Sequence, residues 1–173
     1  MTSAPHAKTL EERIKLLEDQ FAIYQLISAY GPAADSCNMK DIKRLWHEES
    51  VYEVGGLGRF EGYAGFKENF EGDFHQGVVK AGSAHISAFP HVIDEGDRAV
   101  ATHYGTLYTH RDGQFVCVRL IASRWQFVRT ADKGWQIMRR TNVLLDGNPE
   151  ARKLLSRAMA GPDPVSGDRD RSA

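Results

Sequence analysis

The side chain with the clearest potential for acid–base chemistry in this sequence is Asp35. It continues the line Ile14, Phe21 and Ser28 at heptad spacing, so the apolar side of a long helix would end in a carboxylate. A carboxylate directed towards a core is costly unless it has a partner. A functional interpretation therefore requires a base or a cation that faces Asp35. The alternative is a solvated helix-end residue bonded to local backbone.

Seven histidines could supply that partner, and periodicity leaves the choice among them open. Four fall on or beside expected strands, and three fall near helix ends or in the first residues, where a surface position is expected. The first group is His85, His91, His103 and His110, and the second is His6, His47 and His75. Zinc or iron needs three or four convergent ligands. These histidines lack a recognisable ligand spacing, so no metal site is predicted.

The strand expected at 98–109 has one side that is typical of a pocket wall. Its even positions carry hydroxyls and two tyrosines, Tyr104 and Tyr108, and they lead to His110. The odd positions include His103. Because successive side chains of a strand point to opposite faces, we predict that the even side lines a pocket.

The next strand carries two arginines on opposite faces, Arg119 and Arg124, so at most one of them points inward. Ser123 shares the face of Arg119 and could bond a ligand. If that face is the inner one, the outer face is apolar enough to need cover from a partner. It would carry Val116, Val118, Leu120 and Arg124.

The elements that would position these residues are a long helix and a later sheet. Apolar residues at helical spacing predict a helix over 10–35 whose apolar side faces the core, with Thr9 as cap and an interruption at Gly31-Pro32. The apolar residues are Leu10, Ile14, Leu17, Phe21, Tyr24 and Ile27. Alternation from His85 onwards predicts four antiparallel strands. They cover 85–94, 98–109, 114–130 and 135–145, after helices near 38–47 and 66–74, a strand at 51–54 and a loop at 77–84, and before a helix near 149–160.

Helices first and a long antiparallel sheet afterwards predict an α+β fold. The 173 residues suit one domain, expected at 10–160, with a flexible arm at 1–9 and a disordered tail at 161–173. The net charge of −1 argues against nucleic-acid or membrane partners. Cys37 and Cys117 have no pairing motif, and the start lacks the apolar core of a signal peptide, so we expect free thiols and a cytoplasmic protein.

Four segments together resemble a known family over residues 10–145. They are Leu26-Ile27-Ser28-Ala29-Tyr30 before Asp35, Leu45-Trp46-His47-Glu48-Glu49-Ser50-Val51-Tyr52, Ala84-His85 before Pro90, and Phe127-Val128-Arg129 before Gly134-Trp135-Gln136-Ile137. The chain resembles the SnoaL-like proteins of the nuclear transport factor 2-like superfamily. The pattern is nearest to scytalone dehydratase, bile-acid 7α-dehydratase and hexachlorocyclohexane dehydrochlorinase. The resemblance implies a cone-shaped, curved antiparallel sheet wrapped on the long N-terminal helix.

The resemblance also implies site residues. The Asp–His dyad of those enzymes falls on Asp35 and His85. A tyrosine that holds the substrate carbonyl falls on Tyr52, and further family positions fall on His110 and Tyr30. The substrate-orienting residues differ, so the resemblance supports proton abstraction and neither named substrate.

These implications lead to a specific expectation of function. The chain would be a cofactor-independent lyase of the dehydratase type that acts on a hydrophobic, cyclic small molecule. An isomerase or polyketide cyclase that uses the same base is the first alternative. A non-catalytic β subunit of a ring-hydroxylating dioxygenase, or a small-ligand-binding protein, is the second. A homo-oligomer is expected, a trimer ahead of a dimer. Expected substrate-binding residues are Phe60, Phe66, Phe70, Tyr104, Tyr108 and Ser123.

Overall fold

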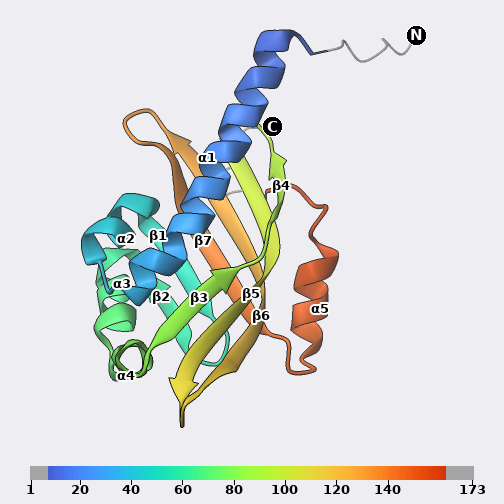
Figure 1. Ribbon diagram of the computed structural model, residues 1–173. Helices are drawn as coiled ribbons and strands as arrows, with labels where there is room; N and C mark the ends of the chain where they lie inside the picture. Colours follow the sequence, from blue (N-terminus) through green and yellow to red (C-terminus); the bar gives the residue numbers. More distant parts are fainter. Residues whose placement is uncertain (1–7, 163–173) are drawn as a thin grey trace, which may run out of the picture.

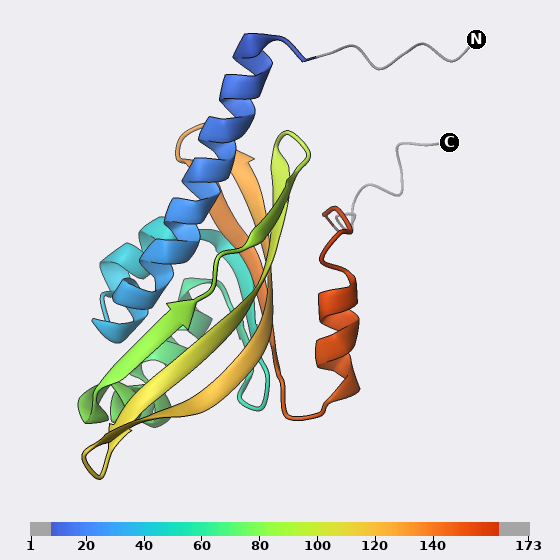
Figure 2. The same cartoon turned by 45° about the vertical axis from the view of Figure 1, so that its right-hand side comes forward.

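A computed structural model describes residues 8–162 and shows one strongly curved sheet with helices on both faces. Four helices lie over one face and α5 lies over the other, as Figures 1 and 2 show together. The helices are α1 (Leu10–Asp35), α2 (Met39–Leu45), α3 (Gly62–Glu71), α4 (Asp73–Ala81) and α5 (Pro149–Ser156). The arm expected at 1–9 and the tail expected at 161–173 fall largely outside the described residues.

The sheet contains seven strands in the order β2-β1-β7-β6-β5-β3, and β4 also pairs with β5. The strands are β1 (Trp46–Val54), β2 (Gly58–Glu61), β3 (Ser83–Ser87), β4 (His91–Asp94), β5 (Arg98–Arg111), β6 (Gln114–Thr130) and β7 (Gly134–Leu144). The α+β class is confirmed. The sheet is mixed, however, because β1 runs parallel to β7. Hairpins join β5, β6 and β7, whereas β1 precedes them and reaches the sheet through a crossover, so its direction is free of the hairpin constraint.

The long helix α1 begins with the predicted capping box. The Thr9 hydroxyl accepts from the Glu12 amide, and the Glu12 carboxylate accepts from the Thr9 amide. The helix continues through Pro32 to Asp35, so Gly31-Pro32 does not end it. Its last residue is therefore the carboxylate that the heptad line reaches.

The predicted buried face of α1 is wrong for the first half of the helix. Leu10, Ile14, Leu17 and Phe21 are between 47% and 69% exposed. A helix of 26 residues is about 39 Å long, and Figure 1 shows its N-terminal half projecting beyond the sheet. In the half that does contact the sheet, Ile27 is buried as predicted, and the other buried residues, Ile23, Tyr30 and Ala34, lie outside the predicted line.

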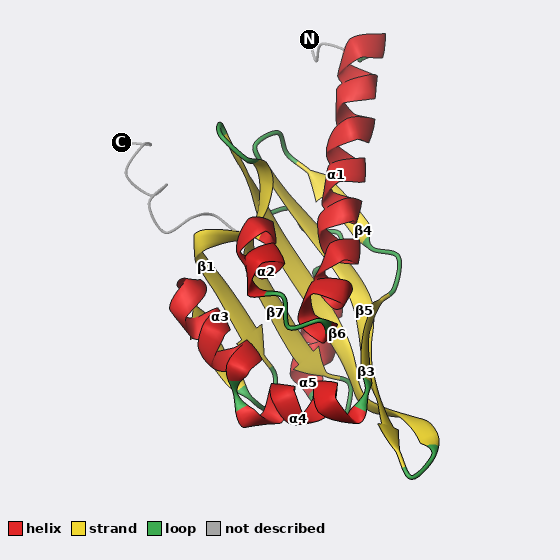
Figure 3. Cartoon of the chain, turned by 60° about the vertical axis from the view of Figure 1, so that its left-hand side comes forward, coloured by secondary structure: helices red, strands yellow, loops and turns green. Residues whose placement is uncertain are grey.

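Two further boundaries differ from the predictions. The strand expected at 85–94 is divided into β3 and β4, and the intervening segment contains Pro90, which has no amide to donate to a ladder. The loop expected at 77–84 is mostly helix α4, which also carries Phe74. Figure 3 shows α2, α3 and α4 gathered beside the C-terminal end of α1, over one edge of the sheet.

The main hydrophobic core lies between α1 and the sheet. Its largest fully buried side chains include Trp46, Trp125, Phe66 and Phe70, with Tyr30 among them. The Tyr30 ring contacts Trp125 and Trp46 edge to face, with centroids 5.5 and 6.3 Å apart. These large rings fix the C-terminal half of α1 on the sheet, and so they fix the position of Asp35.

Candidate active site

A cavity opens between the end of α1, helices α3 and α4, and the sheet strands β1, β3, β5, β6 and β7. The space inside it, counted together with the open solvent at its mouth, is about 630 Å³. Apolar residues such as Val54, Val78 and Leu107 form part of its wall. Polar side chains reach it from α1, β1, β3, β6 and β7, and Tyr30, Tyr52, His85, Arg119 and Arg140 are among them.

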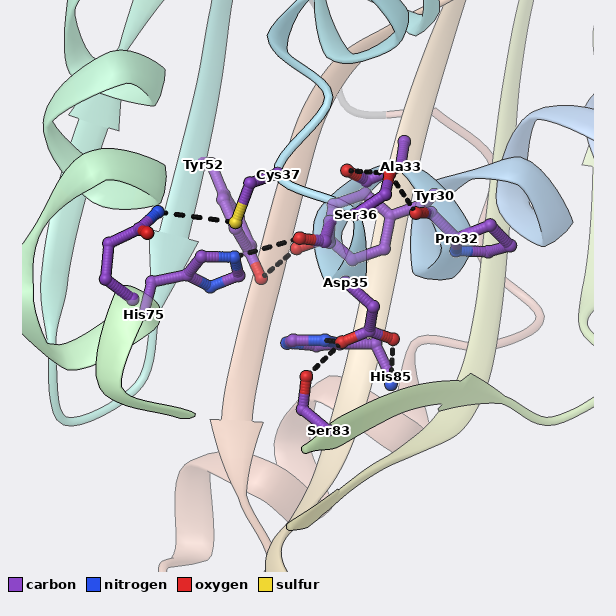
Figure 4. Close-up of polar contacts among 12 residues, drawn as sticks. Tyr30, Pro32, Ala33, Asp35, Ser36, Cys37, Tyr52, His75, Ser83 and His85 are labelled. Atoms are coloured by element: carbon purple, nitrogen blue, oxygen red, sulfur yellow. Dashed lines mark hydrogen bonds and ion pairs between the residues drawn. The ribbon is translucent and has the colours of Figure 1, made fainter. Parts of the chain in front are cut away.

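Asp35 and His85 form a hydrogen-bonded pair at this cavity (Figure 4). The Nδ1 atom of His85 lies 2.7 Å from one carboxylate oxygen of Asp35. The Ser83 hydroxyl donates to the same oxygen at 2.6 Å, and the other oxygen accepts from the His85 backbone amide at 2.7 Å. Gly31 permits this arrangement, because a side chain there would collide with the carbonyl oxygen of His85. The helix therefore approaches β3 closely enough for the two side chains to meet.

The hydrogen bonds keep Asp35 ionised. Burial disfavours the carboxylate, but the bonds from the His85 ring, the Ser83 hydroxyl and the His85 amide outweigh it and lower the pKa of Asp35. The carboxylate also ends a helix with no basic residue in its last turn, where the helix dipole is unfavourable to negative charge. A positive charge on His85 would therefore be stabilised by Asp35.

The geometry fixes the form of His85 that is useful as a base. An ionised carboxylate only accepts hydrogen bonds, so Nδ1 of His85 must carry the proton. The Nε2 atom forms no hydrogen bond with any residue in 8–162, and the ring lines the cavity. When the ring is neutral, Nε2 holds a free lone pair that can take a proton from a ligand.

A second histidine, His75, stands beside this pair. Its ring centroid is 5.7 Å from that of His85, and its Nε2 atom lies 3.0 Å from the Ala34 carbonyl oxygen. Burial lowers the pKa of His75 below the ordinary value of an imidazole. His75 is thus a neutral side chain that lines the cavity, and its Nε2–H donates to the Ala34 carbonyl oxygen near the end of α1. The expectation that His75 lies on the surface is wrong.

Tyr52, which also lines the cavity, has three polar neighbours. Its hydroxyl oxygen accepts from Asn142 at 3.0 Å and from Arg140 at 3.2 Å, and the hydroxyl oxygen of Tyr30 lies 3.1 Å away. The Tyr30 hydroxyl is the donor in this third contact, and the Tyr52 proton meets no acceptor among residues 8–162, so it can be offered to a ligand. Burial raises the pKa of Tyr30 well above the ordinary range, so that residue stays a neutral phenol.

The cation behind the tyrosines is Arg140, which is almost fully buried. Its guanidinium carbon lies 4.1 Å from the Trp125 ring centre and 4.2 Å from that of Tyr30, and its Nε donates to Ser123. The aromatic rings stabilise the cation in place of water. Arg140 therefore brings a fixed positive charge to the wall of the cavity that His85 also lines.

Several residues expected to bind substrate do not line the cavity. Phe66 and Phe70 are fully buried in the main core, and Phe60 packs against that core. Ser123 is buried behind Arg140 and bonds that arginine rather than the cavity. Helix α3 turns its aromatic stripe into the core between sheet and helices, so these rings support the cavity walls from behind.

The predicted inward face of β5 is reversed. The odd residues Gly105 and Leu107 line the cavity together with Thr106, whereas Tyr104 is 53% exposed on the other face. Tyr108 does not line the cavity either. His110 lies exposed near the end of β5 with its ring 5.2 Å from that of Phe115, so it cannot serve at the cavity as expected. The alternating tyrosines and hydroxyls of the even side resemble a pocket lining in the sequence, but in the fold it is the odd side, with Gly105 and Leu107, that faces the cavity.

His103, on the inner face of β5, lies in the core and not at the cavity. Its Nε2 accepts from the indole N–H of Trp125 at 2.6 Å, and its Nδ1 lies 2.7 Å from the Tyr104 carbonyl oxygen. These two bonds define a neutral ring with the proton on Nδ1. Burial lowers the pKa of His103 to about 4. His103 therefore anchors Trp125 in the core and does not reach the cavity.

Sequence reasoning missed Arg140 and His75. The register of β7 with β6 shifts between Ile137 and Arg139, a bulge that moves the inward positions from odd to even numbers. Simple alternation from Trp135 would turn Arg140 outward. The signal available for His75 was its spacing from Phe70 and Val78, which becomes informative only once α4 is known to be a helix.

No described helix is long and apolar enough to cross a membrane. Residues 8–162 also contain no group of three or more metal-binding side chains in positions to hold an ion. Both cysteines are free thiols, as expected.

Comparison with known families decides the affiliation of this fold. The SnoaL-like domain matches residues 15–141, which is most of the chain. The chain belongs to the SnoaL-like family. The resemblance of its motifs to that family is thus confirmed, together with the α+β cone fold of the nuclear transport factor 2-like superfamily.

Solved SnoaL-like and related structures agree with this assignment. A nuclear transport factor 2-like protein with a cystatin-like fold from Novosphingobium aromaticivorans is 37% identical, with a TM-score of 0.81, and the match covers 87% of this chain and 99% of that one. A proposed aromatic ring hydroxylase from the same species is 28% identical, with a TM-score of 0.57 over 75% and 90% of the two chains.

A more distant structure, a proposed dehydratase of the same superfamily from Streptomyces avermitilis, is 14% identical, with a TM-score of 0.61 over 75% and 97% of the chains, and shows the fold alone. No curated protein matches this chain.

Proposed function

We propose that this SnoaL-like protein is a cofactor-independent lyase of the dehydratase type, with His85 as the general base. The observation that carries the proposal is the Asp35–His85 pair, whose bond through Nδ1 leaves Nε2 free at the cavity. Nε2 would remove a proton from a carbon next to a carbonyl group. Asp35 would hold the tautomer and stabilise the imidazolium that forms.

Tyr52 and Arg140 would stabilise the negative charge that develops on the carbonyl oxygen. The Tyr52 oxygen accepts from Arg140 and Asn142, and these bonds polarise its own O–H towards a ligand. Donors that are already oriented in a site of low dielectric are effective because they need no rearrangement during the reaction. Tyr30, a neutral phenol beside Tyr52, keeps that hydroxyl in place.

The proton balance of the elimination closes within the site. His85 takes the proton from the carbon, and the C–O bond to a hydroxyl on the next carbon breaks as the C=C bond forms. The imidazolium then returns the proton to the leaving hydroxyl, which departs as water. This path needs the C–H and C–O bonds on the same face of the substrate, and it needs no redox partner.

The same base could serve an isomerase or a polyketide cyclase, in which the proton returns to carbon and no water leaves. The mass of the product distinguishes these reactions, because dehydration removes one water and isomerisation changes nothing.

A second candidate function is a non-catalytic β subunit of a ring-hydroxylating dioxygenase. The likeness to the proposed aromatic ring hydroxylase from Novosphingobium aromaticivorans favours it. Such a subunit would co-purify with a coloured iron–sulfur α subunit from its native host. A colourless homo-oligomer that turns over substrate alone would exclude it.

Turnover of a panel of cyclic β-hydroxyketones, followed by mass spectrometry, tests the proposal. We expect each product to have lost one water relative to its substrate. His85→Gln cannot accept the proton and should be inactive even at high pH, while His91→Gln serves as a matched control on the exposed strand β4. Full activity of His85→Gln would overturn the assignment of the base.

A further inference from the structure

The permanent charge on the wall of the cavity is positive. Among the residues of 8–162 that line it, Arg119 and Arg140 carry permanent charge, and no carboxylate lines it. Asp35 lies behind His85, which it already bonds. Neither arginine forms an ion pair with a described residue. A ligand in this cavity therefore meets two cations that the protein leaves without an anionic partner.

The two arginines differ in how many N–H donors they keep available for a ligand. Arg140 is enclosed by aromatic rings and bonded to Ser123 and Tyr52, so its position is determined by the protein. Arg119 donates to the Gly55 carbonyl oxygen and is only half-buried, and burial lowers the pKa of its guanidinium. A guanidinium has five N–H donors in a planar fork. Arg119 thus retains donors for a ligand.

The register of the sheet places Arg119 at a definite distance from the base. His85 is opposite Leu107 on β5, and Leu107 is opposite Arg119 on β6. The three residues form one row across three strands, so the backbones of His85 and Arg119 lie roughly 10 Å apart. That span is about the width of one or two fused rings plus a substituent, with the small Gly105 beside it.

We propose that the ligand of this cavity is an organic monoanion, an apolar ring body with a carboxylate, and that Arg119 binds the carboxylate. The ring would lie over Leu107 and Gly105, with its reactive carbon at His85. This inference rests on the proposed function only for the choice of site, because it concerns binding and not turnover. A bidentate pair between a guanidinium and a carboxylate supplies both energy and orientation.

Binding of 2-naphthoate and of its neutral isostere 2-naphthamide, measured by isothermal titration calorimetry, tests the proposal. We expect the carboxylate to bind at least ten-fold more tightly. Arg119→Met keeps the length of the side chain but removes the charge, and it should weaken the carboxylate by about ten- to hundred-fold without changing the amide. Arg119→Lys should recover part of the difference, since it keeps the charge but not the fork.

The control variant is Arg152→Met, an exposed arginine on α5, which should bind both probes as the wild type does. Three outcomes would overturn the inference. The two probes could bind equally, the preference for the carboxylate could survive in Arg119→Met, or neither probe could bind at millimolar concentration. If 2-naphthoate binds through Arg119 but no cyclic β-hydroxyketone of the panel is turned over, the lyase proposal is contradicted and this inference stands. Turnover of neutral substrates without a carboxylate preference would do the reverse.

Discussion

At the scale of single residues, the site depends on which proton each side chain holds. Asp35 is an acceptor for three hydrogen bonds, His85 keeps its proton on Nδ1, and His103 is a neutral ring between Trp125 and a carbonyl. These assignments follow from the partners rather than from the residue types. Two histidines on neighbouring strands thus serve different ends, one at the cavity and one in the core.

Asp35→Asn should abolish activity while the protein stays folded. The amide oxygen can still accept from the His85 backbone amide, but the NH₂ group would then face Nδ1 and push the ring proton to Nε2. The base would hold the wrong tautomer, which predicts a loss of about 10²–10⁴ in kcat/KM. Circular dichroism and turnover of the same sample check this. A variant with full activity would show that Asp35 is structural.

Because the buried His103 ring is neutral in the folded protein, the free energy of unfolding should fall in mild acid. Its pKa is about 4 in the folded protein and about 6.5 when unfolded, so the unfolded chain binds more protons between these values. The stabilisation is complete above about pH 6.5 and is lost as the pH falls towards 4, by about 3 kcal/mol. Urea unfolding at pH 7, 5.5 and 4.5 measures it.

His103→Gln is the matched control for that measurement. Glutamine can still accept from the Trp125 indole but does not titrate, so the free energy of unfolding should vary less with pH in this range. Asp19 and Asp35, whose pKa values are lowered despite burial, add their own loss below about pH 4 in both proteins. An unchanged slope in the variant would assign the pH dependence to other groups.

At the scale of elements, the site depends on how closely α1 approaches β3. A helix ending in a carboxylate and a strand beginning with Ser83 and His85 meet because Gly31 lets the backbones come together. The capped start of α1 and the aromatic core hold the helix in this position. Helices α3 and α4 and strands β1, β5, β6 and β7 supply the rest of the cavity wall.

Gly31→Ala should therefore separate the pair. The added methyl group collides with the His85 carbonyl oxygen, and relief of that clash requires a shift of the helix or of β3. Overpacking of this kind costs about 1–3 kcal/mol. Activity should fall further than stability, because the hydrogen bond at Nδ1 lengthens. Thermal unfolding and kcat/KM, measured together, check both effects.

Gly77→Ala is the control, since Gly77 lies within the exposed face of α4 with nothing near its absent side chain. Alanine in a helix interior is favoured over glycine by about 1 kcal/mol, so this variant should be neutral or more stable. Comparable losses in the two variants would indicate a general intolerance of the helices rather than a contact specific to Gly31.

At the scale of the whole molecule, two of the regions that expose large apolar side chains bear on assembly. One is the projecting half of α1, and the other is the region of β5 and β6 near their hairpin, with Phe115, Val116 and Leu120. Helix α5 covers the part of the outer sheet face around Arg124, which donates to the carbonyl groups of Arg157 and Ala160. That cover is supplied by the chain itself.

We expect a homo-oligomer in solution, a trimer ahead of a dimer, with the uncovered outer face of β6 buried between subunits. Leu120→Glu should dissociate it, because a buried unpaired carboxylate is costly. Leu17→Glu on the projecting half of α1 is the comparison. A monomeric wild type in sedimentation equilibrium would contradict the expectation. If Leu17→Glu dissociates the oligomer and Leu120→Glu does not, the interface lies on α1 and not on β6.

The sequence alone determined the parts of this protein that depend on local order. Heptad spacing carries a helix to Asp35, hairpin turns set the pairing of β5, β6 and β7, and the motifs around Tyr30, Trp46 and His85 indicate the family. These features survive because neighbours in the chain largely decide them. The length of α1 could therefore be predicted from the sequence, whereas the face that it buries could not.

Tertiary structure alone decided which side chains meet. The partner of Asp35 lies 50 residues away, and only the close contact at Gly31 selects His85 over the other histidines on geometric grounds. A bulge in β7 turns Arg140 inward and reverses what alternation predicts, and the folding of α4 brings His75 to the cavity. Such choices depend on distances across the fold and on the parity of strands, which a pattern along one chain does not contain.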